Sequence, residues 1–150
     1  MDLDKMARWI ERYETSRFRM NQSLNAIIKQ QIDPQLTLEQ FSLLCNIYKS
    51  KGGCTPTELA DYFCVNKSAI TAMITRLENK GLIERVRDST DRRVVYLSLT
   101  SLGHEVCEMG RINITEQLSR YLSQFSEDEI EMFMDSFEKL AELMQQDRKE

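Results

Sequence analysis

The sequence predicts a mainly α-helical fold with one small β-hairpin near its middle. Apolar residues recur at helical spacing near both ends of the chain, from Leu3 to Ile27 and from Ile130 to Met144. Helix-capping patterns divide the segment between Thr37 and Gly81 into shorter helices. Two strand-like runs then flank a polar loop. These observations indicate helical ends around a small mixed centre.

The first expected helix is long and ends at a proline. Its apolar face extends over about seven turns and consists of Leu3, Met6, Ile10, Tyr13, Met20, Leu24 and Ile27. Asp33-Pro34 ends it, because a proline disfavours helical geometry in the preceding residue. A second helix begins at about Thr37 and closes at Gly52-Gly53. The apolar face of this second helix consists of Phe41, Leu44, Cys45 and Tyr48.

Two shorter helices follow, with a tight turn between them. Thr55-Pro56-Thr57-Glu58 is a capping box with proline at the first helical position, and it opens the first of the two. Cys64-Val65 is the expected turn, and Asn66 is the expected N-cap of a helix that stops at Gly81. The inner face of that helix consists of Ile70, Met73, Ile74 and Leu77. Two helices joined by so short a turn form a helix-turn-helix.

A hairpin directly after the helix-turn-helix is the wing of a winged helix-turn-helix. Leu82 to Arg87 and Val94 to Leu99 are the expected strands, around the loop Asp88-Ser89-Thr90-Asp91. A long helix from Thr100 to about Gln124 and a last one capped at Ser126 complete the chain. We expect a single domain over residues 1–150, with the winged helix-turn-helix at 36–100 and helical regions at 1–34 and 101–150.

Composition limits the class of protein. Of the 150 residues, 41% are apolar and 29% are charged, as in an ordinary soluble globular domain. No stretch approaches the ~18 uncharged apolar residues of a membrane span, and the amino terminus is too charged for a secretory signal. We therefore expect a cytoplasmic protein with no membrane association.

The net charge of −4 is unevenly distributed. Residues 1–65 carry a net charge of 0, residues 66–98 of +3 and residues 99–150 of −7. A basic segment within an acidic chain is compatible with a surface that faces DNA phosphates. Counterion release depends on the face presented rather than on the total charge.

The sequence predicts no metal site, no cofactor and no catalysis. The four cysteines, Cys45, Cys54, Cys64 and Cys107, lack C-x-x-C spacing, and His104 is the single histidine. We expect the four cysteine thiols to be reduced and buried. No nucleophile with its base and no paired carboxylates are recognisable, and Gly52-Gly53 lacks the Lys-Ser/Thr of a phosphate-binding loop.

The centre of the chain resembles the multiple antibiotic resistance regulator (MarR) family. The motifs that match in order and spacing are Leu36-Thr37, Gln40-Phe41, Glu58-Leu59-Ala60, Arg76-Leu77-Glu78, Lys80-Gly81-Leu82-Ile83-Glu84-Arg85, Asp91-Arg92-Arg93, Ser98-Leu99-Thr100 and Gly103. The resemblance implies a transcriptional regulator, most often a repressor, that binds a pseudo-palindromic double-stranded DNA operator. It also implies a homodimer, in which the first and last helices interlock between protomers.

The expected DNA-reading surface begins on the second helix of the helix-turn-helix. Its outer face consists of Asn66, Lys67, Ser68, Thr71, Ala72, Thr75 and Arg76. Short side chains let a helix approach base edges; Ala72 would meet a thymine methyl group, and Arg76 a guanine or a phosphate. The alternative is an ordinary solvated helix face.

The wing is the second part of that surface. The resemblance places Arg93 in the minor groove, with Asp91 orienting the loop and Arg92 near the DNA backbone. A narrow minor groove has an enhanced negative potential that attracts arginine. Arg85 and Arg87 are further expected phosphate contacts. The alternative is that Asp91 only caps a turn and the arginines are solvated.

A small anionic or aromatic effector is a further expectation. Arg17 interrupts the apolar stripe of the first helix, and a buried guanidinium needs a partner such as a carboxylate. The resemblance adds a ligand crevice, which in this chain would include Arg17, Asn21, Leu44, Tyr48 and His104. The alternative is a structural ion pair of Arg17 across the dimer, with Glu14 or an acidic residue of the last helix.

Two other functions stay open. A thiol-based redox regulator would use Cys54, which follows Gly53 in an expected loop and is the most accessible candidate. The resemblance places the reactive cysteine of peroxide-sensing members in the first helix, where this chain has none. A winged helix can also serve as a protein-docking module without DNA, because fold does not determine function.

Overall fold

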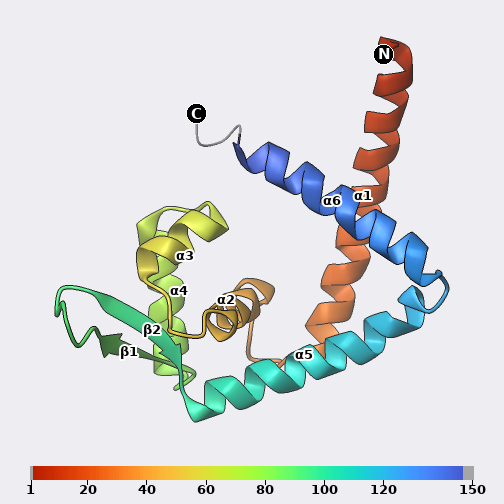
Figure 1. Ribbon diagram of the computed structural model, residues 1–150. Helices are drawn as coiled ribbons and strands as arrows, with labels where there is room; N and C mark the ends of the chain where they lie inside the picture. The colour runs from red at the N-terminus through yellow and green to blue at the C-terminus, as the bar shows by residue number, and fades with distance from the viewer. Residues whose placement is uncertain (1, 147–150) are drawn as a thin grey trace. The chain divides into compact units, whose positions relative to one another are not determined.

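The computed structural model describes residues 2–146, and this range contains six α-helices and one two-stranded antiparallel sheet (Figure 1). The helices are α1 (Leu3–Gln31), α2 (Leu38–Lys49), α3 (Pro56–Phe63), α4 (Lys67–Asn79), α5 (Ser101–Leu122) and α6 (Glu127–Gln146). The strands β1 (Ile83–Arg87) and β2 (Val95–Leu99) lie between α4 and α5 in the chain. The predicted mainly α-helical fold with one hairpin is confirmed.

The chain divides into two compact units, the first ending at Ile114 and the second beginning at Thr115. The boundary falls inside α5, so one continuous helix contributes to both units. The first unit holds α1 to α4, the hairpin and the first part of α5; the second holds the rest of α5 and α6. The expected single domain over residues 1–150 stays a prediction.

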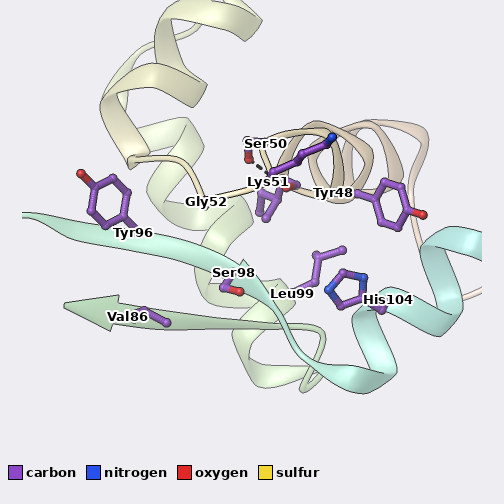
Figure 2. A pocket seen from close by; sticks show the side chains of 11 residues that line it. Tyr48, Ser50, Lys51, Gly52, Val86, Tyr96, Ser98, Leu99 and His104 are labelled. Atoms are coloured by element: carbon purple, nitrogen blue, oxygen red, sulfur yellow. Dashed lines mark hydrogen bonds between the residues drawn. The ribbon is translucent and has the colours of Figure 1, made fainter. Parts of the chain in front are cut away.

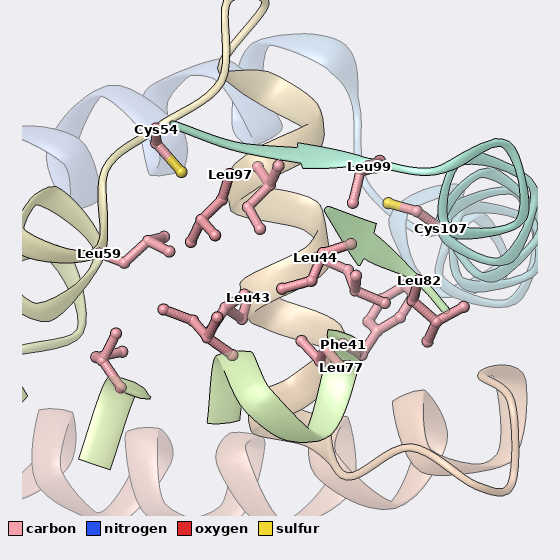
Figure 3. Packing of buried hydrophobic residues seen from close by; sticks show 14 of the residues in the cluster. Phe41, Leu43, Leu44, Cys54, Leu59, Leu77, Leu82, Leu97, Leu99 and Cys107 are labelled. Carbon is pink, nitrogen blue, oxygen red and sulfur yellow. The ribbon is translucent and has the colours of Figure 1, made fainter. Parts of the chain in front are cut away.

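The core of the first unit is built around α2. Although this helix is only 12 residues long, five of its residues are buried, namely Gln40, Phe41, Leu43, Leu44 and Ile47. The expected inner face of α4 packs on the same core, with Ile70, Ile74 and Leu77 buried and Met73 partly buried. Figure 3 shows Leu43 and Leu44 of α2 beside Leu97 and Leu99 of β2. Burying this apolar surface stabilises the helix-turn-helix and the hairpin as one body.

The cap that begins α3 and the turn that leads into α4 follow the predicted pattern. The Thr55 hydroxyl oxygen accepts from the Glu58 N–H at 3.2 Å, and the Glu58 carboxylate accepts from the Thr55 N–H at 2.7 Å. Cys64 ends α3 in the left-handed region, at a φ of 54°. Asn66 then caps α4, because its Oδ1 accepts from the Ala69 N–H at 2.8 Å.

The hairpin has a third backbone partner. Within it, β1 pairs with β2 from Ile83 opposite Leu99 to Arg87 opposite Val95. On the other edge of β2, the Cys54 N–H donates to the Leu97 carbonyl at 3.3 Å, and the Leu97 N–H donates to the Cys54 carbonyl at 2.7 Å. The pairing satisfies backbone groups that an open strand edge would expose. It anchors the wing to the segment that leads into α3.

Two glycines bring α5 close to the core. A Cβ added at Gly103 would lie 1.9 Å from the carbonyl oxygen of Leu82. One added at Gly110 would lie 2.6 Å from the ring of Phe41. Real Cβ atoms do not approach so closely, so α5 can occupy this position only because both residues lack a side chain.

The helix α1 reaches the core of the first unit only at its carboxyl end. Ile28 packs against the core, and Ile32, just past the helix, is buried. The Lys29 Nζ donates to the Leu36 carbonyl, and the Asn113 amide donates to the Gln31 carbonyl at 3.3 Å. None of the residues of α1 is itself buried. Its earlier apolar side chains, namely Leu3, Trp9, Ile10, Tyr13, Phe18 and Met20, are exposed.

In the second unit, α6 also lacks a buried residue. Ser126 and Glu129 form the predicted capping box at its start, with the Ser126 N–H donating to the Glu129 carboxylate at 2.9 Å. Phe133 is 54% and Phe137 39% exposed, and their rings stack with centroids 5.7 Å apart. The apolar face that the spacing predicts is therefore present on α6.

Candidate nucleic-acid interface

The outer face of α4 is exposed along the helix. All of the predicted reading residues are accessible, namely Asn66, Lys67, Ser68, Thr71, Ala72, Thr75 and Arg76. The opposite face is buried in the core through Ile70, Ile74 and Leu77. The helical period therefore gathers the predicted residues on one continuous solvent-facing surface.

The first residues of this surface also organise the start of α4. The Ser68 hydroxyl donates to the Asn66 Oδ1 at 2.8 Å, and the same oxygen accepts from the Ala69 N–H. Asn66 therefore has its amide N–H groups left to donate, whereas Ser68 has its hydroxyl oxygen left to accept. Both side chains hold the amino end of the helix in place.

The two threonines of α4 are restricted in the same way. The Thr71 hydroxyl donates to the Lys67 carbonyl at 2.7 Å, and the Thr75 hydroxyl donates to the Thr71 carbonyl at 2.9 Å. With its proton engaged, each hydroxyl presents an acceptor oxygen and a methyl group to solvent. Such a surface can accept from the amino group of adenine or cytosine and can contact a thymine methyl group.

Asp91 holds the wing loop by accepting hydrogen bonds from two backbone N–H groups. Its carboxylate accepts from the Arg93 N–H at 3.0 Å, and its carbonyl accepts from the Val94 N–H at 3.0 Å. The Asp88 N–H donates to the Val94 carbonyl and closes the hairpin. Arg92 and Arg93 are left exposed at the tip. The orienting role that the resemblance implies for Asp91 therefore has a geometric basis.

Asp88 stabilises the first half of the same loop. Its Oδ1 accepts from the Thr90 N–H and the Thr90 hydroxyl, both at 2.7 Å, and from the Asp91 N–H at 3.2 Å. These hydrogen bonds, the one from the Thr90 hydroxyl foremost, lower the pKa of Asp88 to about 2. The loop is thus organised around two aspartates, of which sequence reasoning singled out only Asp91.

One of the two additional arginines has a partner within the chain. Arg85 of β1 forms a two-pronged ion pair with Glu78 of α4, in which the Nε–Oε1 distance is 2.7 Å. This pair ties the first wing strand to the end of α4. Arg87, one strand period further, is exposed. Of the two expected phosphate contacts, Arg87 is therefore the more available.

A pocket of about 300 Å³ opens beside the wing, between the end of α2, the loop after it, the hairpin and the start of α5. Figure 2 shows Tyr48 and His104 on one side of it and Tyr96 and Ser98 of β2 on another. The rings of Tyr48 and His104 meet edge to face, with centroids 5.6 Å apart. Lys51 also lines the pocket. The lining combines aromatic surface with a cation.

The predicted effector residues are only partly brought together. Tyr48 and His104 line this pocket, but Leu44 does not, because it is fully buried in the core. Arg17 and Asn21 do not line it either, and both are exposed on α1. Arg17 is exposed in the single chain, since α1 meets the core only in its last turn, and its expected burial between the dimer helices stays a prediction.

The cysteines also differ from expectation. Cys54 is buried, with 5% of its surface exposed, because its backbone pairs with Leu97 and carries the side chain inward. Burial raises the pKa of its thiol. The prediction that Cys54 is the accessible thiol is therefore wrong. The expected burial is also wrong for Cys64, which is exposed at the left-handed turn after α3.

Comparisons with known proteins agree on one family. The sequence profile of the MarR family matches residues 36–95. The HTH-type transcriptional repressor MdtR of Bacillus subtilis is 34% identical over 127 residues, which are 85% of this chain and 79% of that protein. The chain belongs to the MarR family. Its winged-helix fold follows from this membership, and the family consists of DNA-binding transcription regulators rather than enzymes.

Two further MarR relatives differ in how much they cover. The multiple antibiotic resistance protein MarR of Salmonella typhimurium is 36% identical over 92 residues, which span 61% of this chain and 63% of that protein. A solved structure of a cysteine-to-serine mutant of MarR from Escherichia coli, complexed with operator DNA, has a TM-score of 0.71 and 27% identity. That match covers 93% of this chain and 99% of the MarR chain.

Other kinds of site are not visible in the described range. Between residues 2 and 146, no helix has the length and hydrophobicity that a membrane crossing requires. In the same range, His, Cys, Asp and Glu side chains form no group of three or more that could hold a metal ion.

Proposed function

We propose that this chain regulates transcription by binding double-stranded DNA through α4 and the wing. The observation that carries the proposal is the wing loop, in which Asp91 holds the Arg93 backbone and leaves Arg92 and Arg93 exposed. A folded loop that presents two arginines costs little entropy on binding, because its backbone is already ordered. The net charge of +3 in residues 66–98 adds attraction to phosphates.

The two surfaces would read different grooves. In this proposal α4 enters the major groove, where Thr71 and Thr75 accept from base amino groups and Ala72 meets a thymine methyl group. Arg93 enters the adjacent minor groove, whose narrow A·T-rich form attracts arginine. Lys67, Arg76, Arg87 and Arg92 would contact phosphates, or for Arg76 a guanine.

The active form would be a homodimer. The apolar faces of α1 and α6 support this, because neither helix buries a residue within the chain. Exposed apolar faces of this extent mark protein–protein contacts. A two-fold dimer would bind a pseudo-palindrome with half-sites about one helical turn, ~10 to 10.5 bp, apart. A regulator of this kind acts where chromosomal DNA is, in the cytoplasm.

The regulatory outcome would be repression, released by a small anionic or aromatic molecule. The relative from Bacillus subtilis is named a repressor. The pocket beside the wing supports an effector, because the rings of Tyr48 and His104 can contact an aromatic ligand and the Lys51 ammonium can pair with a carboxylate. Such a ligand must bind the DNA-incompetent state more tightly, or it shifts nothing.

DNA binding can be tested by fluorescence anisotropy. The dimer would be titrated onto DNA from its own promoter region and onto unrelated DNA of equal length, at several salt concentrations. We expect tighter binding to the promoter fragment by a factor on the order of 10³ or more, with a steep loss as salt rises. Equal binding to both fragments, or none, would favour the alternative of a protein-docking winged helix.

The effector pocket can be tested separately. Salicylate would be titrated against the wild type, Lys51→Ala and Arg17→Ala, with thermal stability and operator release as readouts. We expect salicylate to raise the thermal stability of the wild type and of Arg17→Ala and to release both from operator DNA. Lys51→Ala should respond only weakly. A response that Arg17→Ala loses and Lys51→Ala keeps would show that the effector lies at α1 instead.

A further inference from the structure

Three contacts join α2 to the first part of α5. Phe41 meets Gly110, Cys45 meets Cys107, and Tyr48 meets His104. The three residues of α2 are four and three positions apart, and their partners on α5 follow in reverse order, three positions apart. The three contacts therefore lie on facing stripes of two antiparallel helices. The middle contact of the three consists of two thiols, neither of which the DNA-binding surface uses.

The two thiols of the pair are in direct contact. The Cys45 and Cys107 sulfur atoms are 3.6 Å apart, although the two residues are 62 positions apart in the sequence. A disulfide is about 2.05 Å long, so the two sulfurs would have to approach by about 1.5 Å. Cys107 is fully buried, whereas Cys45 is partly exposed. A small oxidant would therefore reach Cys45 first.

The surroundings favour a thiolate on the same cysteine. A hydrogen bond from Cys107 and the positive charges of Arg111 and Lys49 lower the pKa of Cys45, despite its burial. The same hydrogen bond and burial raise the pKa of Cys107. Because the thiolate is the reactive form, Cys45 has the character of the attacking cysteine and Cys107 that of the resolving one.

We propose that Cys45 and Cys107 form an oxidation site, at which a hydroperoxide closes an intrachain disulfide between α2 and α5. The Cys45 thiolate attacks the terminal oxygen of the hydroperoxide; the S–O bond forms, the O–O bond breaks, and Cys45 becomes a sulfenic acid. The alkoxide or hydroxide that leaves takes a proton from solvent and departs as an alcohol or water. Cys107 then attacks the Cys45 sulfur. The S–S bond forms, the S–O bond breaks, and hydroxide leaves with the Cys107 proton as water.

The bond would act one helical turn from the effector pocket. Cys45 is three residues before Tyr48, and Cys107 is three residues after His104. Closing the disulfide would draw α2 and α5 together beside the pair that lines the pocket. The disulfide does not require that the chain bind DNA, so its test is independent of the proposed function.

The test is to treat the reduced full-length protein with hydrogen peroxide and map its thiols by mass spectrometry after non-reducing digestion. We expect one joined peptide pair, Cys45 with Cys107, formed with loss of two hydrogen atoms and reversed by dithiothreitol. Wild-type protein alone supports this readout, so it does not depend on the folding of any variant. Thiols left unchanged at both positions would overturn the proposal.

Three variants assign the roles of the two cysteines. In Cys107→Ser, the sulfenic acid should persist on Cys45 and be trapped by dimedone. In Cys45→Ser, Cys107 should stay unmodified. Cys64→Ser removes the exposed thiol and should leave disulfide closure unchanged. A disulfide that maps to Cys54 or Cys64, or one that disappears in Cys64→Ser, would also overturn the proposal.

Discussion

At the scale of single residues, the threonines of α4 and the arginine of the wing differ in what they can distinguish. Thr71 and Thr75 have their hydroxyl protons bound to helix carbonyls, so they present acceptors of fixed direction. Arg93 presents a flexible cation on an ordered loop. The threonines would therefore select bases, whereas the arginine would mainly add affinity and recognise groove width.

We predict that Thr71→Val alters base preference, because valine keeps the methyl group and removes the acceptor oxygen. The preference at the contacted position should change by about 1 to 3 kcal/mol, with little change on random DNA. Thr71→Ser should retain the preference. Selection from a randomised operator library measures this, and an equal loss on specific and random DNA would show that Thr71 does not read bases.

Arg93→Ala should instead weaken binding to all DNA and reduce the salt slope by about 1. The matched control is Lys139→Ala, which removes one positive charge from α6, outside the winged helix-turn-helix. Anisotropy titrations at several salt concentrations would compare the two. If both variants lose affinity equally, net charge rather than the wing accounts for the effect.

The wing loop should also respond to strong acid. Asp88 has a native pKa of about 2, below the 3.8 of an unperturbed aspartate, so its contribution to loop order is present above about pH 4 and is lost as the pH falls through about 2. NMR titration of the Thr90 and Asp91 amides should follow this midpoint, and Asp88→Asn should remove it. A midpoint near 3.8 would mean that Asp88 does not hold the loop.

At the scale of secondary-structure elements, the position of α5 depends on two glycines, although glycine is a poor helix former. Glycine lowers helix stability by roughly 1 kcal/mol relative to alanine. Yet Gly103 is in direct contact with the Leu82 carbonyl and Gly110 with Phe41. Packing of α5 on the winged helix therefore outweighs the intrinsic propensity of the isolated helix.

We predict that Gly103→Ala destabilises the fold, although alanine is the better helix former. The added Cβ would lie 1.9 Å from the Leu82 oxygen, and α5 must shift to relieve the clash. The expected loss is about 1 to 3 kcal/mol, measured from the midpoint of urea unfolding.

Gly52→Ala is the control, because a Cβ there meets nothing within 4 Å. It should change the free energy of unfolding by no more than about 0.5 kcal/mol. A Gly103→Ala protein as stable as the control would show that α5 does not pack this closely in solution.

At the scale of the whole molecule, most of the apolar face of α1 and most of that of α6 are exposed. We predict a constitutive homodimer, with a sedimenting mass twice the 17.6 kDa of the chain at micromolar concentration. Phe133→Glu together with Phe137→Glu should yield monomers and lose operator affinity. Asp135→Asn, on the same helix, should stay dimeric. A folded wild-type monomer at micromolar concentration would refute this prediction.

Local sequence signals were sufficient to predict the helices and strands. Caps at Thr55, Asn66 and Ser126, and the proline at position 34, act over three or four residues, so their helix ends were predictable. The outer face of α4 followed from its inner one by the helical period alone. Asp91 and its arginines were predictable through the family motif, which matches residues adjacent in the chain.

Only the tertiary structure decided which distant residues meet. Cys54 is buried because a strand edge far along the chain covers it, and Cys45 meets Cys107 because α5 packs back on α2. The pocket needed the same long-range packing to join Tyr48 and His104, and it left Arg17 and Asn21 out. Sequence periodicity states which face of a helix is apolar, but not what lies against it. That choice is made by the summed burial of all elements together, which no local pattern contains.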